Sequence, residues 1–257
     1  MWFEEAKERI AQVSGIVGFL VKNLNTGETF SVNDDLVFPS ASTIKVPILL
    51  TLLDAHAAGT IDIDSPAPVT PQELVGGCGL IQHLNNAIAY TLRDHAVLMI
   101  ILSDNVATNK LISTLGMDAI NAKIREMGAS ATVLGRKMMD AEARKQGRDN
   151  FTSCRDMLKI FTYIHQNADR YADALAILKQ QQLNDLLPVW TPREEYEFAH
   201  KTGELDGIRH DVGIMYLDDP IFVAFYTKEL KDEHDGIRLA NDLGALVYRQ
   251  YKAKQPA

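Results

Sequence analysis

The stretch Ser42-Thr43-Ile44-Lys45 opens a helical pattern that runs to about Gly59. Ser42 and Lys45 are three residues apart, which places their side chains on one face at the start of this helix. A serine hydroxyl is a weak nucleophile and needs an adjacent base. Unpaired N–H groups at a helix start also favour negative charge as it develops. The stretch therefore predicts a nucleophilic serine with a lysine beside it.

Two further motifs follow in the chain, Ser103-Asp104-Asn105 and Lys201-Thr202-Gly203. An S-x-x-K match alone is expected roughly once by chance in a chain of this length, whereas each of the other two is expected roughly 0.05 times. All three in this order form the signature of class A β-lactamases and penicillin-binding proteins. The chain resembles the class A-like serine hydrolases of this family over essentially its whole length.

The resemblance implies an acyl-transfer mechanism. Ser42 would attack the lactam carbonyl, and Lys45, aided by Lys201, would move the protons. Ser103 would pass a proton to the departing lactam nitrogen. For Lys45 to act as a base at neutral pH, its pKa must fall through burial or through a neighbouring cation such as Lys201.

The resemblance also implies a set of substrate-binding residues. Asn105 would contact the side-chain amide of the substrate. The carboxylate of the substrate would lie beside Lys201 and Thr202. Gly203, a glycine inside a predicted strand, marks a close approach of a ligand or another backbone. The oxyanion hole would be the backbone N–H groups of Ser42 and Glu204.

Glu204 departs from the family, whose members usually carry a small or short polar residue here. Its carboxylate would repel an anionic substrate unless it pairs with a cation, and Arg209 is a candidate partner. Arg209 itself resembles the arginine that some class A enzymes use for the substrate carboxylate.

A second departure concerns release of the acyl group. The family activates water with a glutamate in a Glu-x-x-Leu-Asn pattern that follows an arginine, and this pattern is absent here. An alignment on Arg136 puts Met138 at the position of the glutamate, and methionine cannot act as a base. Asp140 or Glu142 could take the role if the loop is rerouted, and Glu142 is the preferred candidate. The alternative is that both carboxylates are solvated or paired with arginines.

The order of helical and strand patterns predicts an α+β fold. An antiparallel sheet would be flanked by N- and C-terminal helices and would carry an inserted all-helical lobe. The chain would form a single β-lactamase-like domain over residues 1–257, with an α+β lobe from about 1–41 and 190–257 and a helical lobe over about 42–189. The expected strands are 16–24, 29–32, 198–205, 211–217 and 221–226, and the expected terminal helices are 2–13 and 234–251.

Composition limits the function classes. The chain has 257 residues, of which 46% are hydrophobic and 23% charged, as in soluble globular proteins. A net charge of −8 argues against nucleic acid or an anionic membrane surface as a partner. Cys78 and Cys154 are expected to be free thiols, although one long-range disulfide stays open. No metal-ligand spacing is present, and neither a metal nor a cofactor is expected.

The N-terminus lacks a basic segment followed by an apolar one, so no signal peptide is visible. The sequence as given therefore predicts a cytoplasmic location, or a periplasmic or secreted one if a leader was removed.

Three functions are compatible with these residues. The first is a class A-type serine β-lactamase acting on a small-molecule β-lactam. The second is a cytosolic amidase, esterase or D,D-peptidase that takes D-Ala-peptide-like substrates with the same acylation apparatus. The third is a penicillin-binding sensor that is acylated and then stalls.

Overall fold

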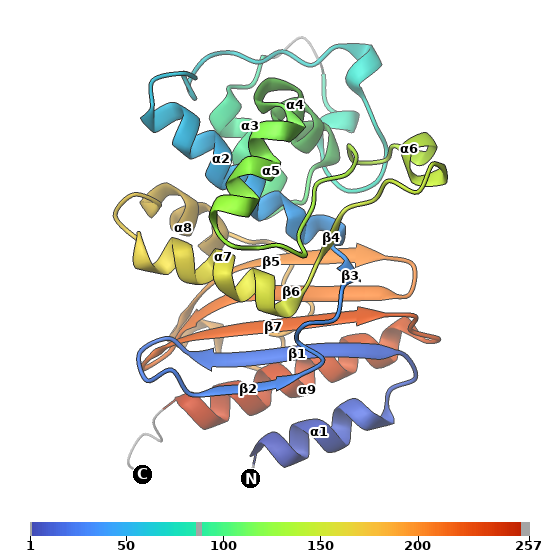
Figure 1. Cartoon of the computed structure of the whole chain (residues 1–257), viewed down its shortest axis with the longest axis vertical. Helices are drawn as coiled ribbons and strands as arrows, with labels where there is room; N and C mark the ends of the chain where they lie inside the picture. Colours follow the sequence, from blue (N-terminus) through green and yellow to red (C-terminus); the bar gives the residue numbers. More distant parts are fainter. Residues whose placement is uncertain (1, 86–88, 253–257) are drawn as a thin grey trace.

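A five-stranded antiparallel sheet built from both ends of the chain forms the centre of the molecule (Figure 1). The computed structural model describes residues 2–85 and 89–252. The strand order is β2-β1-β7-β6-β5, so the pairing of β1 with β7 joins the N-terminal hairpin to the C-terminal strands. The strands are β1 (Ile16–Asn23), β2 (Thr29–Val32), β5 (Glu197–Leu205), β6 (Ile208–Tyr216) and β7 (Pro220–Lys228).

The two terminal helices, α1 (Trp2–Gln12) and α9 (Glu233–Tyr251), cover one face of this sheet (Figure 1). Apolar side chains of the sheet and of α9 form a buried cluster there, which includes Phe19, Phe225 and Leu243. Alternate residues of a strand point to opposite faces, so the other side chains of β1 and β7 face the helical block. The predicted α+β fold, with a sheet flanked by terminal helices, is confirmed.

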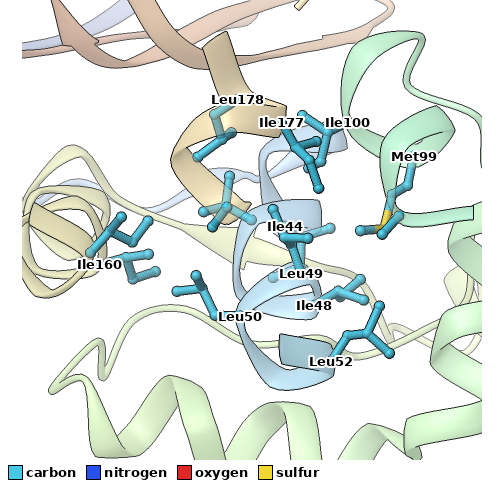
Figure 2. Close-up of a cluster of buried hydrophobic side chains, with 14 of the residues drawn as sticks. Ile44, Ile48, Leu49, Leu50, Leu52, Met99, Ile100, Ile160, Ile177 and Leu178 are labelled. Carbon is cyan, nitrogen blue, oxygen red and sulfur yellow. The ribbon is translucent and has the colours of Figure 1, made fainter. Parts of the chain in front are cut away.

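The helical block lies on the other face of the sheet, and α2 runs through its interior (Figure 1). Figure 2 shows side chains of α2, such as Leu49, packed against residues of α3, α7 and α8, such as Ile100, Ile160 and Leu178. Since α2 is apolar on nearly all sides, its first residue, Lys45, is carried into the interior as well. The helices are α2 (Lys45–Ala57), α3 (Leu92–Ile101), α4 (Asn105–Leu115), α5 (Met117–Glu126), α6 (Ala141–Lys145), α7 (Cys154–Gln166) and α8 (Ala172–Lys179).

Three local features differ from the expectations. Ser42 does not lie in the α-helix itself but in a preceding 3₁₀ turn, Ala41–Ile44. β6 begins at Ile208 instead of Asp211, because the turn after β5 is tight and pairing resumes at once. A small second sheet pairs β3 (Phe38–Pro39) with β4 (Phe151–Thr152), and strands this short leave no sequence period to detect.

Both cysteines are free thiols, Cys78 exposed and Cys154 buried. Within residues 2–85 and 89–252, no helix combines the length and the apolar character that crossing a bilayer requires.

Candidate active site

Ser42 lies in a tight turn pressed against β5. Ala41, directly before it, has a φ of +46°, a left-handed conformation that is uncommon for residues other than glycine. A Cβ on Gly203 would lie 3.1 Å from the Ala41 Cβ and 3.2 Å from the Ser42 nitrogen. Glycine at this strand position therefore lets β5 approach the Ser42 backbone, which is the close approach expected from the sequence.

The Lys45 ammonium connects the first two motifs. Its Nζ lies 2.9 Å from Ser42 Oγ, 3.0 Å from Ser103 Oγ and 2.8 Å from the Ser103 carbonyl oxygen. The Asn105 Oδ1 is a further acceptor at 3.0 Å. Burial lowers the pKa of Lys45 well below its usual value, and the charge of Lys201 lowers it further. Ser42 Oγ thus lies within hydrogen-bond distance of a buried amine whose charged form is destabilised.

Lys201 brings the third motif to the same point. Its Nζ donates to Ser103 Oγ at 3.2 Å and to the Thr202 carbonyl at 2.9 Å. Burial lowers the pKa of Lys201 to about 7, although the nearby Asp211 opposes this shift. The positive charge of Lys201 disfavours a second positive charge on Lys45.

Ser103 sits between the two lysines in a strained backbone conformation, with a φ of +54°. Asp104 holds this turn through hydrogen bonds to three backbone N–H groups. Its Oδ2 accepts from the backbone N–H groups of Leu80 (2.7 Å) and Ile81 (2.9 Å), and its Oδ1 caps α4 through Ala107. Asp104 therefore positions the turn through backbone N–H groups. Ser103, by contrast, is hydrogen-bonded to Lys45.

Two cavities meet at Ser42. The larger cavity encloses about 420 Å³ and includes Asn105 and Met138 in its wall. The smaller cavity encloses about 250 Å³ and includes Ser103, Thr202 and Gly203. Ser42 lines both, and so do Cys78 and Glu204. This geometry leaves space on two sides of Ser42.

A model of the β-lactamase enzyme family matches residues 3–251 of the chain. The chain belongs to that family. The β-lactamase VEB-1 of Pseudomonas aeruginosa is 21% identical over 260 residues, which cover 93% of this chain and 86% of the relative.

Two solved structures extend the likeness. A β-lactamase from Sphaerobacter thermophilus superposes with a TM-score of 0.89 at 27% identity, covering 100% of this chain and 98% of the other. A leucine-to-glutamate mutant of PBP-A, solved as an acyl-enzyme complex with penicillin G, superposes with a TM-score of 0.88 at 27% identity. The superposition covers 97% of this chain and 96% of the other. The family and these structures identify a serine β-lactamase-like hydrolase.

Arg209 of this hydrolase is occupied by other protein groups. Its Nη2 pairs with Glu233 Oε2 at 2.5 Å and with Glu204 Oε1 at 3.1 Å. Its Nη1 donates to the carbonyls of Leu205 (3.1 Å) and Ile208 (2.8 Å). The expected Glu204–Arg209 pair is present, but both terminal nitrogens of the guanidinium are engaged, which weighs against a second role for Arg209 in binding the substrate carboxylate.

The loop opposite Ser42 places its candidate bases differently. Met138 is 7% exposed and lines the larger cavity. Asp140 lines it too, while its Oδ1 caps α6 by accepting from the Ala143 N–H. Glu142 is absent from the described lining residues, has a side chain 72% exposed and lies 4.0 Å from Lys145. The structure therefore brings Asp140 toward the cleft and leaves Glu142 in solvent.

Sequence reasoning missed Asn109. Its side chain accepts from the Met138 N–H at 2.7 Å and donates to the Met138 carbonyl at 3.0 Å, which fixes that residue at the cavity wall. Asn109 is four residues after Asn105 on α4, so helical spacing alone could have placed it on the same face. Among the described residues, no group of three histidine, cysteine or acidic side chains is placed to hold a metal.

Proposed function

We propose that this protein opens β-lactam rings by class A-type acylation of Ser42. The observation that carries the proposal is the buried Lys45 amine, 2.9 Å from Ser42 Oγ, with a pKa far below its usual value. Lys45 takes the hydroxyl proton as Ser42 Oγ bonds to the lactam carbonyl carbon. The N–H groups of Ser42 and Glu204 stabilise the resulting oxyanion.

Collapse of this intermediate breaks the carbon–nitrogen bond of the ring. Ser103 Oγ gives its proton to the departing nitrogen and recovers one from Lys45, so that Lys45 returns to its neutral form. Lys201, 3.2 Å from Ser103 Oγ, supplies the positive charge that favours this transfer and attracts the carboxylate of the substrate. The product is an ester on Ser42.

Hydrolysis of this ester is the slow step in our proposal. Met138 supplies no base at the wall of the larger cavity, and the carboxylate of Asp140 is partly committed to capping α6. Of the two loop carboxylates, Asp140 is the better placed to activate water, since Glu142 lies outside the cavity lining. The acyl-enzyme therefore accumulates before it is released.

A second candidate function is a D,D-peptidase-like or related amide hydrolase that uses the same serine. Its support is the similarity to wild-type PBP-A, with a TM-score of 0.86 at 26% identity and 97% of this chain covered. The absence of a glutamate at the loop position favours it as well, because a peptidase needs no fast release of penicilloyl groups.

The deciding experiment mixes the protein with a chromogenic cephalosporin and follows both colour and intact mass. We expect a stoichiometric adduct that Ser42→Ala abolishes, followed by slow turnover. Ser113→Ala, an exposed serine on α4, is the matched control. An unchanged reaction in Ser42→Ala would contradict the mechanism. Absence of any adduct, combined with hydrolysis of D-Ala peptides, would favour the second function.

A further inference from the structure

The larger cavity receives the acyl half of the substrate. Ser103, which protonates the leaving nitrogen in the proposed function, lines only the smaller cavity. The leaving group therefore lies on that side, and the acyl side chain extends from Ser42 into the larger cavity, past Asn105.

The larger cavity carries an excess of negative charge. Its lining includes five carboxylates and two guanidinium groups, and Arg209, which lines the adjoining smaller cavity, brings the formal charge of the set to −2. One carboxylate pairs with both guanidiniums of the lining, at 2.8 and 3.5 Å. The carboxylates are Asp140, Asp149, Glu204, Asp206 and Glu233, and the guanidiniums are Arg136 and Arg144.

Glu204 is the carboxylate nearest to the reaction. It follows Gly203 on β5, its backbone N–H is one of the two oxyanion donors of the proposed function, and its side chain lines both cavities. Although it contacts Arg209, its side chain is 64% exposed, so the carboxylate is open to solvent at the edge of both cavities.

Arg209 lines the smaller cavity and is not among the described lining residues of the larger one. Glu233 on α9 and two backbone carbonyls hold its guanidinium, whose side chain is only 10% exposed. An acyl side chain in the larger cavity therefore meets the Glu204 carboxylate without direct contact with this cation, and charges that line a cleft act on a ligand through their summed field.

We infer that Glu204 is a charge-selecting residue, which makes this site favour acyl donors with a cationic group on the acyl side chain over those with an anionic one. This inference rests on the proposed acylation of Ser42. It names the substrate class that the site accepts best: β-lactams or peptides whose acyl side chain carries an ammonium group.

Three penicillins that differ at one carbon provide the test. Ampicillin carries an ammonium group, benzylpenicillin none and carbenicillin a carboxylate, on otherwise matched side chains. We expect second-order acylation rates, measured by mass at low ionic strength, to fall in that order with a total span of about tenfold. About 1 M salt should shrink the span, because it screens exposed charges.

Variants assign the effect to one residue. Glu204→Gln should reduce the span to less than about twofold, whereas Glu197→Gln, at the far end of the same strand, should keep it. Arg209→Gln should widen the span, since it removes the cation that partly neutralises Glu204. A merely structural effect would not reduce the span of rates in Glu204→Gln and widen it in Arg209→Gln.

Equal rates for the three penicillins, or an unchanged span in Glu204→Gln, would overturn the inference. Aryl thioesters that carry the same three acyl side chains separate this outcome from failure of the proposed function. If Ser42 opens no lactam but its rates with the thioesters still depend on the charge of the acyl side chain, the proposed ring opening is wrong and charge selection by Glu204 is supported. If Ser42 reacts with neither series, both proposals are wrong.

Discussion

The two walls of the cleft differ in how firmly their polar groups are held. On the wall of Ser42, Lys45, Ser103 and Lys201 are joined by hydrogen bonds of 2.9–3.2 Å, and both lysines are fully buried. On the opposite wall, the loop that contains Asp140 and Glu142 presents exposed side chains. In the proposed function, the first wall supplies the groups for acylation. The second wall lacks a comparably fixed base among its described residues, so the proposal assigns bond formation to Ser42 and release from it to separate parts of the molecule.

Burial makes the first wall reactive. An amine in water near neutral pH is almost fully protonated, whereas desolvation and the neighbouring Lys201 charge destabilise the ammonium form of Lys45. Glu142, by contrast, lies in solvent with a side chain that is 72% exposed. The difference between the walls is therefore one of environment as much as of residue type.

Removing the base of the first wall should have the largest effect. Lys45→Met keeps the length and the apolar stem but provides no proton acceptor, and we expect acylation to fall about 10³-fold. Stopped-flow or mass measurements of adduct formation check this. Lys110→Met, a lysine of α4 paired with Glu73, is the control. A loss of less than tenfold in Lys45→Met would show that another group activates Ser42.

Adding a base to the second wall should have the next largest effect. Met138→Glu would place a carboxylate at the wall of the larger cavity, on a backbone that Asn109 already holds. We expect release of the acyl group to accelerate about 10- to 100-fold with little change in acylation. The burst and the steady-state rate of cephalosporin hydrolysis separate the two steps.

Val133→Glu is the control, because Val133 is 40% exposed and is not among the described lining residues of either cavity. Faster release in the Val133 variant as well, or no acceleration in the Met138 variant, would show that position 138 does not contact the attacking water.

The first wall and the fold that carries it were largely predictable from the sequence. The S-x-x-K and S-D-N motifs lie at the starts of patterned helices and K-T-G lies within strand β5, so the fold only has to bring these three segments together. Glycine at position 203 indicated the close approach of β5. Helix and strand boundaries followed from apolar spacing within a few residues.

The second wall was much less predictable. The loop after Arg136 has no periodic pattern of apolar residues. Its course depends on the two hydrogen bonds between the Asn109 side chain and the Met138 backbone, which no local sequence pattern encodes. The engagement of Arg209 by Glu233 likewise joins residues 24 positions apart. Spacing along the chain can suggest which carboxylate acts as a base, but only the folded loop decides which one reaches the cleft.

The charge state of Lys201 predicts a pH dependence that belongs to the first wall alone. Lys201 carries its positive charge below its pKa of about 7 and loses it as the pH rises through that value. Acylation should therefore fall above pH 7, approaching about tenfold per pH unit.

Lys201→Arg tests this assignment, because a guanidinium keeps its charge across the range. The slopes of the rate–pH profiles are compared, so a lower absolute rate in the variant does not affect the outcome. An alkaline decline of equal slope in both proteins would place the titrating group elsewhere.

Breaking the link between the walls should have the smallest effect. Asn109→Ala removes both hydrogen bonds to the Met138 backbone and should lower the free energy of unfolding by about 1–3 kcal/mol. Asn121→Ala is a close control, since Asn121 makes the same pair of bonds to Leu134, at 2.9 and 3.0 Å. Both variants should lose similar stability in urea unfolding.

Only Asn109→Ala should also cancel most of the gain in release of the acyl group that Met138→Glu provides, because a base accelerates the reaction only when its backbone is held in place. Equal release in Met138→Glu with and without Asn109 would show that the second wall positions Met138 by packing alone.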